Sequence, residues 1–232
     1  MDKLRIPFFA AALFVLLLAV LVEFAAAEPL ARLTAGQLGT KTPGIAINYL
    51  ALLDALILYN LVWMALGLIF PREITGRAQG IITLVLSFFA LIGTIVLIFA
   101  AFALLMVMIA LLLAIPFGTI AYFAAWGHFA VKAAAATLGL AMLLKLGFCV
   151  LLVLAHQQFL QNKGLVILVA VSLGLTWGTN FVQAFLPGFL VSIGDALVAL
   201  IVAVFAAIWL LLLLITSIIA TIKAILSLRK VA

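Results

Sequence analysis

The sequence TLVLSFFALIGTIVLIFAAFALLMVMIALLLA, residues 83–114, decides how this chain folds. It lies within a longer segment, residues 81–126, that contains no charged residue. A helix needs about 20 apolar residues to cross the hydrocarbon core of a bilayer, so this segment is longer than one crossing requires. Pro116 and Gly118 interrupt the apolar pattern near its end. We therefore predict one long, tilted helix over residues 81–113, followed by an interfacial or re-entrant segment over residues 114–132.

The composition indicates that lipid is the solvent for most of this chain. Hydrophobic residues make up 70% of the sequence and charged residues 8%, whereas a soluble domain carries about 25% charged residues. A formal net charge of +6 would suggest a nucleic-acid partner in a soluble protein, but here the basic residues lie at predicted helix ends and indicate orientation instead. We therefore expect the lipid bilayer as a partner and no nucleic acid. Cys149 is the only cysteine of the sequence, so an intrachain disulfide is excluded.

The hydropathy pattern predicts an all-α fold, a polytopic transmembrane helical bundle of about six membrane-spanning helices, with the helix at 81–113 unusually long. The whole chain, residues 1–232, is expected to form a single transmembrane domain. The predicted spans are residues 6–27, 45–70, 81–113, 133–156, 165–186 and 189–217. Residues 28–44 are expected to form the most polar loop. The first span also resembles a secretory signal peptide with a possible cleavage site at residues 25–27, and this alternative stays open.

The end of the chain has two possible arrangements. Apolar residues over 218–230 recur at the spacing of one helical face, with Lys223, Arg229 and Lys230 available to lipid headgroups. We predict an amphipathic tail over these residues. The alternative is that the last helix extends beyond the membrane without a break.

The distribution of Lys and Arg favours six crossings over seven. With one crossing at 81–113, both termini lie on the same side, together with eight of the twelve basic residues, against three on the other side and Lys145 within the membrane. If residues 81–126 formed a two-helix hairpin, five basic residues would face six. Cytoplasmic loops carry the Lys/Arg excess, so we predict six spans with both termini cytoplasmic, in a bacterial cytoplasmic (inner) membrane.

Several polar residues fall at membrane depth. An ionisable side chain at the centre of a spanning helix costs about 2.5–3.5 kcal/mol on insertion scales and normally faces the bundle interior. Counting residues from the helix ends places Asp54 and Lys145 at similar depths, close enough for an ion pair. We predict a substrate or ion pathway in the outer half of the bundle, formed by five residues: Asp54, Lys145, Asn180, Gln183 and Asp195.

A purely structural interpretation competes with that hypothesis. In it, the Asp54–Lys145 pair fixes helix register, while Glu23 and Asp195 lie at the wet membrane interface. Gly174 and Gly178 have the spacing that lets two helices approach closely. We expect these glycines to pack against a helix of the same chain, or alternatively to form the seam of a homodimer.

The function follows from what the sequence contains and lacks. It has no metalloprotease, serine-hydrolase or phosphate-binding motif, so we expect no enzymatic activity, no cofactor and no metal. Polar residues and helix breakers in the spans favour a small transporter or channel, with a homodimer or a larger membrane complex as its possible assembly. The alternative is a non-catalytic membrane subunit or accessory protein with a packed, dry bundle.

Overall fold

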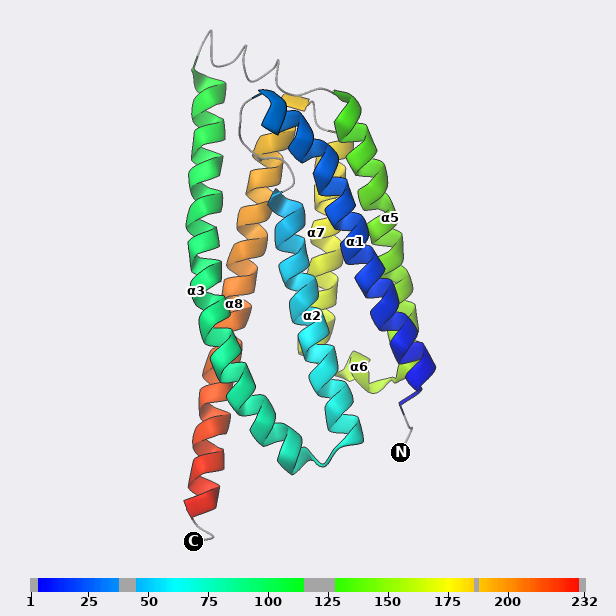
Figure 1. Cartoon of the computed structure of the whole chain (residues 1–232), viewed down its shortest axis with the longest axis vertical. Coiled ribbons are helices and arrows are strands. Elements are labelled where there is room, and N and C mark those ends of the chain that lie inside the picture. The colour runs from blue at the N-terminus through cyan, green and yellow to red at the C-terminus, as the bar shows by residue number, and fades with distance from the viewer. Residues whose placement is uncertain (1–3, 38–44, 115–127, 186–187, 230–232) are drawn as a thin grey trace.

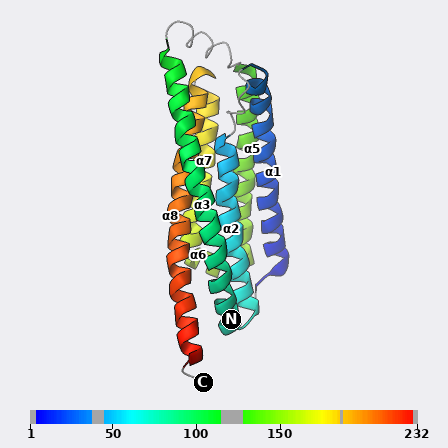
Figure 2. The ribbon, with the colours of Figure 1, turned by 60° about the vertical axis from the view of Figure 1, so that its left-hand side comes forward.

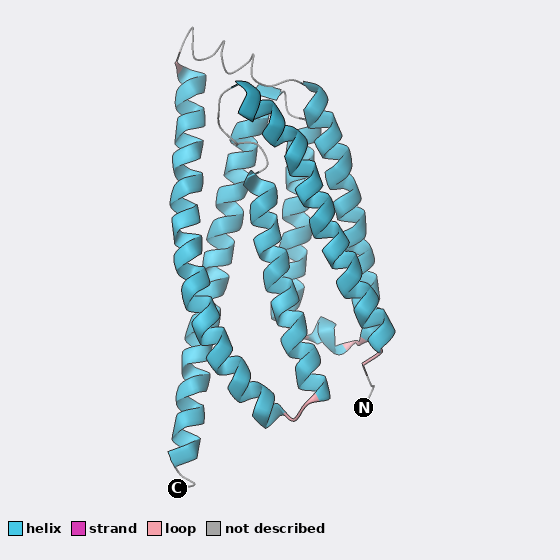
Figure 3. Ribbon diagram, in the orientation of Figure 1, coloured by secondary structure: helices cyan, strands magenta, loops and turns pink. Residues whose placement is uncertain are grey.

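The described part of the chain is an antiparallel bundle of α-helices. The structure, a computed structural model, describes residues 4–37, 45–114, 128–185 and 188–229. These residues contain helices and connecting turns but no strand (Figure 3). In lipid, backbone N–H and C=O groups must be satisfied within the protein, and a helix does this within one segment. Six of the helices are long and apolar enough to cross a membrane, which confirms the predicted fold class.

Three spanning helices precede residue 115. They are α1 (Ile6–Gln37), α2 (Ile45–Ile69) and α3 (Arg72–Leu113). Pro71 separates α2 from α3, because proline cannot continue the helix that precedes it, and its carbonyl accepts the first hydrogen bonds of α3 from the N–H groups of Ile74 and Thr75. α3 is one uninterrupted helix that ends at Leu113, so the prediction of a single long helix here is confirmed, although the helix begins at Arg72 instead of residue 81.

Three further spanning helices follow, with a short helix between the first two of them. They are α5 (His128–Ala155), α6 (Gln158–Gln161), α7 (Lys163–Phe185) and α8 (Gly188–Arg229). The first residue of α1 and the last residue of α8 lie at the same end of the bundle, together with the α2–α3 turn and α6 (Figure 1). The described helices thus pass along the bundle six times, as the distribution of basic residues predicted.

The helices form two groups that differ in their contacts. α1 packs mainly on α5 and α3 mainly on α8, while α2 and α7 lie between these pairs. Both pairs lie side by side in the two ribbon views (Figures 1 and 2). The buried face of α8 carries alanines at Ala196, Ala199, Ala203 and Ala206, spaced by three or four residues. Small side chains at this spacing let neighbouring helices approach closely in lipid.

Some predicted boundaries are wrong. α1 continues to Gln37, so residues 28–37 belong to a helix instead of the predicted loop. α5 begins at His128, five residues before the predicted start. Residues 115–127, most of the predicted interfacial segment, lie outside the described residues. The exceptional length assigned to α3 is shared, because α3 and α8 each contain 42 residues.

The end of the chain follows the second of the two arrangements considered above. Residues 218–229 continue α8 without a break, so they form no separate amphipathic helix. The hydroxyl of Thr221 donates to the carbonyl of Ser217 at 2.8 Å, within one helical turn across this region.

Candidate functional site: a buried charged cluster

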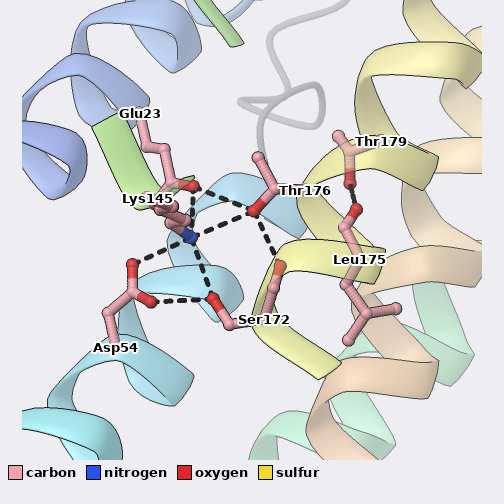
Figure 4. Close-up of polar contacts among 7 residues, drawn as sticks. All are labelled: Glu23, Asp54, Lys145, Ser172, Leu175, Thr176 and Thr179. Atoms are coloured by element: carbon pink, nitrogen blue, oxygen red, sulfur yellow. Dashed lines mark hydrogen bonds and ion pairs between the residues drawn. The ribbon is translucent and has the colours of Figure 1, made fainter. Parts of the chain in front are cut away.

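Three helices bring three ionisable side chains together inside the bundle. Glu23 comes from α1, Asp54 from α2 and Lys145 from α5 (Figure 4). Their relative exposures are 0%, 2% and 3%. The Lys145 Nζ lies 2.7 Å from Glu23 Oε1 and 3.1 Å from Asp54 Oδ2. Ser172 and Thr176 of α7, one helical turn apart, complete the group, and we call these five residues the charged cluster.

The hydroxyls of α7 connect the charged groups to one another. Lys145 Nζ donates to Ser172 Oγ at 2.9 Å and to Thr176 Oγ1 at 3.0 Å. Ser172 in turn donates to Asp54 Oδ1 at 2.8 Å. Thr176 has one hydroxyl proton but two acceptors within reach, Glu23 Oε1 at 3.2 Å and the Ser172 carbonyl at 2.9 Å. It can therefore satisfy only one of these acceptors at a time.

The cluster has more acceptors than donors. A lysine ammonium carries three protons, and four oxygens from the other cluster residues surround Lys145. Glu23 Oε2 is buried without a hydrogen-bond donor among the described residues, and Asp54 Oδ2 has only its ion pair with Lys145. With both carboxylates ionised, the three charged groups carry a net charge of −1. Burying an uncompensated charge in an apolar surrounding is costly, so the cluster favours the arrival of one further positive charge or hydrogen-bond donor.

The surroundings of the cluster are apolar, which strengthens its electrostatic interactions. Leu50, Leu53, Ile57, Leu168 and Ala141 are buried on the same helices within two turns of the charged groups. Water screens charges poorly in such a region. The cluster therefore holds its four helices together and, for the same reason, responds strongly to any change in its own charge.

The predicted site residues have different outcomes in the structure. Asp54 and Lys145 form the predicted ion pair. Asn180 is half-buried on α7, and its Oδ1 is buried without a hydrogen-bond partner among the described residues. Asp195 is buried on α8 at 1% exposure, and none of the contacts that define the cluster involves it. The Gln183 side chain lies outside the described residues.

Three members of the cluster were missing from the predicted site. The purely structural interpretation places Glu23 and Asp195 at the wet interface, which is wrong, because α1 does not end near residue 27 and both side chains are buried. Ser172 and Thr176 are not among the predicted site residues. They lie with Thr179 on one buried face of α7, at spacings of four and three residues. A row of hydroxyls at helical spacing inside an apolar span was the signal available in the sequence.

Gly174 and Gly178 do not approach another of the described helices closely. No described atom outside the local helix backbone lies within 4 Å of the position that a Cβ would take at either glycine. The exposed aromatic residues Trp177, Phe181 and Phe185 occupy the same side of α7 and contact one another in sequence order. The expected intrachain packing at these glycines is therefore absent from the described structure, and the homodimer seam stays a prediction.

Comparison with known proteins adds no assignment. No protein-family model, no curated protein and no solved structure matches this chain. Among the described residues, no group of three or more His, Cys, Asp and Glu side chains is placed to hold a metal ion. The function must therefore be argued from the geometry of the charged cluster.

Proposed function

We propose that this protein is a small membrane transporter, with the charged cluster as the place where a cation or proton binds during transport. The observation that carries the proposal is that two buried carboxylates share a single ammonium group: Glu23 Oε2 has no hydrogen-bond donor among the described residues, and Asp54 Oδ2 has only its ion pair with Lys145. Ionisable residues within membrane spans commonly mark substrate or ion pathways. A further cation would bring the cluster to neutrality.

The polar residues beyond the cluster support a route toward one end of the bundle. Along α7, Thr176 is followed by Thr179 and Asn180 in the direction away from the termini, whereas Leu168 and Leu165 lie in the opposite direction on the same buried face. We propose that the polar end faces outward and that the end with both termini is cytoplasmic, in a bacterial inner membrane. The basic residues near the termini, and Arg72 and Arg77 at the start of α3, agree with this orientation.

Labelling of introduced cysteines tests whether water reaches the cluster from the polar end. In a Cys149→Ala background, which removes the native thiol, Thr179→Cys and Leu168→Cys place single thiols at two buried positions on opposite sides of the cluster. We expect a membrane-impermeant thiol reagent to modify the cysteine at 179 and to leave the one at 168 unmodified. The same reagent is applied after unfolding in detergent, as a control that both thiols react once they are exposed.

Two labelling results would contradict the proposal. If neither cysteine reacts in intact membranes over the time in which exposed thiols react completely, the bundle is dry around the cluster. The charged cluster would then only hold the helices together, as expected for an accessory subunit with a dry bundle. Equal reaction of both cysteines would contradict the one-sided route.

A further inference from the structure

A recess between α1 and α2 reaches the charged cluster from the lipid-facing side of the bundle. Its volume is about 310 Å³. Eight residues line it, four from each helix: Leu13, Leu16, Leu17, Val20, Ala51, Asp54, Ala55 and Leu58. Leu17 and Leu58 at the rim are 57% and 42% exposed, while Leu16 and Asp54 are buried. Among the described residues that line the recess, Asp54 is thus the only one with a charged or polar side chain.

We propose that this recess binds an amphipathic ammonium compound, a primary or secondary amine with an apolar body that enters from the lipid. This inference rests on the proposed transporter function and names its substrate class. The apolar body would lie between α1 and α2, and the ammonium group would donate to Asp54 Oδ2. The recess extends from residue 13 to 20 on α1 and from residue 51 to 58 on α2, about 10 Å along each helix at the rise of an α-helix.

The charges of the cluster fit this ligand. Asp54 Oδ2 has one contact with a donor among the described residues, the Lys145 Nζ at 3.1 Å, and a carboxylate oxygen can accept from a second donor. Lys145 keeps a closer carboxylate, Glu23 Oε1 at 2.7 Å, so an incoming ammonium group can take Asp54 without leaving Lys145 unpaired. With both carboxylates ionised, the bound state contains two cations and two carboxylates and carries no net charge. Under the same condition, an anionic or neutral ligand would leave the excess negative charge in place.

A second recess of the same protein provides an internal comparison. It lies between α2, α3 and α8, has a volume of about 200 Å³ and is also lined by apolar side chains, but its polar lining consists only of Tyr59, Thr83 and Ser87. If apolar burial alone governed binding, both recesses would accept the same compounds. If binding instead requires the Asp54 carboxylate, ammonium compounds bind only in the recess between α1 and α2.

Binding to the purified full-length protein tests this inference. The probes are 4-phenylbutylamine, which is protonated at neutral pH, and 4-phenylbutanol, a neutral analogue of the same shape. We expect saturable binding of the amine at one site per chain and at least tenfold weaker binding of the alcohol. Loss of a buried charge pair across an interface weakens binding by this much or more.

Three variants locate the site. Asp54→Asn removes the charge, and we expect it to weaken amine binding at least tenfold. Ala51→Phe fills the recess between α1 and α2 while every charged residue remains, and should have the same effect. Ala90→Phe fills the second recess and should leave amine binding unchanged. Ala51→Phe keeps the inference falsifiable if Asp54→Asn fails to fold.

The outcomes separate this inference from the proposed function. Equal binding of amine and alcohol, loss of binding in Ala90→Phe but not in Ala51→Phe, or no saturable binding of the amine would overturn the assigned ligand class. If the cysteine at 179 reacts but the amine does not bind, the transporter proposal stands and the ammonium substrate is wrong. If the amine binds but neither cysteine reacts, the binding site stands and the proposed water route from the polar end is wrong.

Discussion

The two halves of this bundle use their hydroxyl groups in different ways. Around the charged cluster, Ser172 of α7 bonds to Lys145 of α5 and to Asp54 of α2. In α3 and α8, the hydroxyls of Thr94 and Ser217 bond to carbonyls of their own helices, at 2.7 and 2.8 Å. The α1–α2–α5–α7 region is therefore connected by polar contacts between helices, while the α3–α8 pair relies on apolar packing.

This difference has an energetic consequence in lipid. Lipid chains are as apolar as leucine, so apolar packing between helices gains little beyond close van der Waals contact. A polar contact between helices fixes their register, and a buried ion pair fixes it most strongly because a lone buried charge is so unfavourable. We infer that the α1–α2–α5–α7 region has one defined arrangement and that substitutions there have larger effects than matched substitutions in α3 or α8.

The largest expected effect comes from removing the single cation of the cluster. Lys145→Met leaves Glu23 and Asp54 as two adjacent buried carboxylates, and breaking a buried ion pair in this way costs about 3–5 kcal/mol. Lys223→Met is the matched control, because the same substitution at an exposed position of α8 should have almost no effect. The measurement is the folded fraction during titration with a denaturing detergent. Equal stability of the two variants would contradict the larger sensitivity expected for the α1–α2–α5–α7 region.

A triple variant separates the charge effect from simple loss of side chains. This variant removes all three buried charges of the cluster at once by the substitutions Glu23→Leu, Asp54→Leu and Lys145→Met. Replacing a buried ion pair or triad by apolar residues is often neutral or stabilising by about 1–4 kcal/mol. We therefore expect the triple variant to be at least as stable as the original protein and to have lost amine binding. A triple variant less stable than Lys145→Met alone would show that packing dominates the effect.

A smaller effect is expected for a pair of serines in the two regions. Ser172 and Ser217 are both buried, at 1% and 4% exposure. Ser172→Ala removes the donor to Asp54 and one acceptor of Lys145, and leaving buried polar groups unsatisfied costs about 1–3 kcal/mol. Ser217→Ala removes only a bond within α8, so its cost should lie within about 0.5 kcal/mol, as for substitutions away from such features. Detergent titration of both variants measures the difference, and equal costs would weaken the comparison.

The sequence predicts the fold better than it predicts the site, for a physical reason. Apolar length is a property of each segment alone, so the spanning helices and the end of α3 at Leu113 follow from the residues. A contact between helices depends on depth and rotation together. The depth of Glu23 was misjudged because residues 28–37 have a polar composition and yet continue α1.

The ion pair shows where such reasoning succeeds. Asp54 and Lys145 are opposite charges in apolar spans, and each requires a partner wherever its helix lies. Their pairing could therefore be predicted without the helix arrangement. Ser172 and Thr176 satisfy their hydrogen bonds in many environments, including their own helix, so nothing in the sequence required them to face Lys145. Only the packing of α7 against α5 and α2 reveals their role.

The smallest expected effect concerns a polar contact that joins the two regions. The Tyr59 hydroxyl of α2 lies 2.6 Å from Thr83 Oγ1 of α3. Tyr59→Phe keeps the ring and its edge-on contact with Trp63 but removes this hydrogen bond. The freed Thr83 hydroxyl can bond to its own helix, as Thr94 does, so we expect a cost of about 0.6 kcal/mol, the average for such bonds between membrane helices. Thr83→Val removes the same bond from the other side, and the double variant should cost no more than either single one. A cost for Tyr59→Phe as large as that of Ser172→Ala would mean that a polar contact also holds α3 in place, and the division into a polar region and an apolar pair would fail.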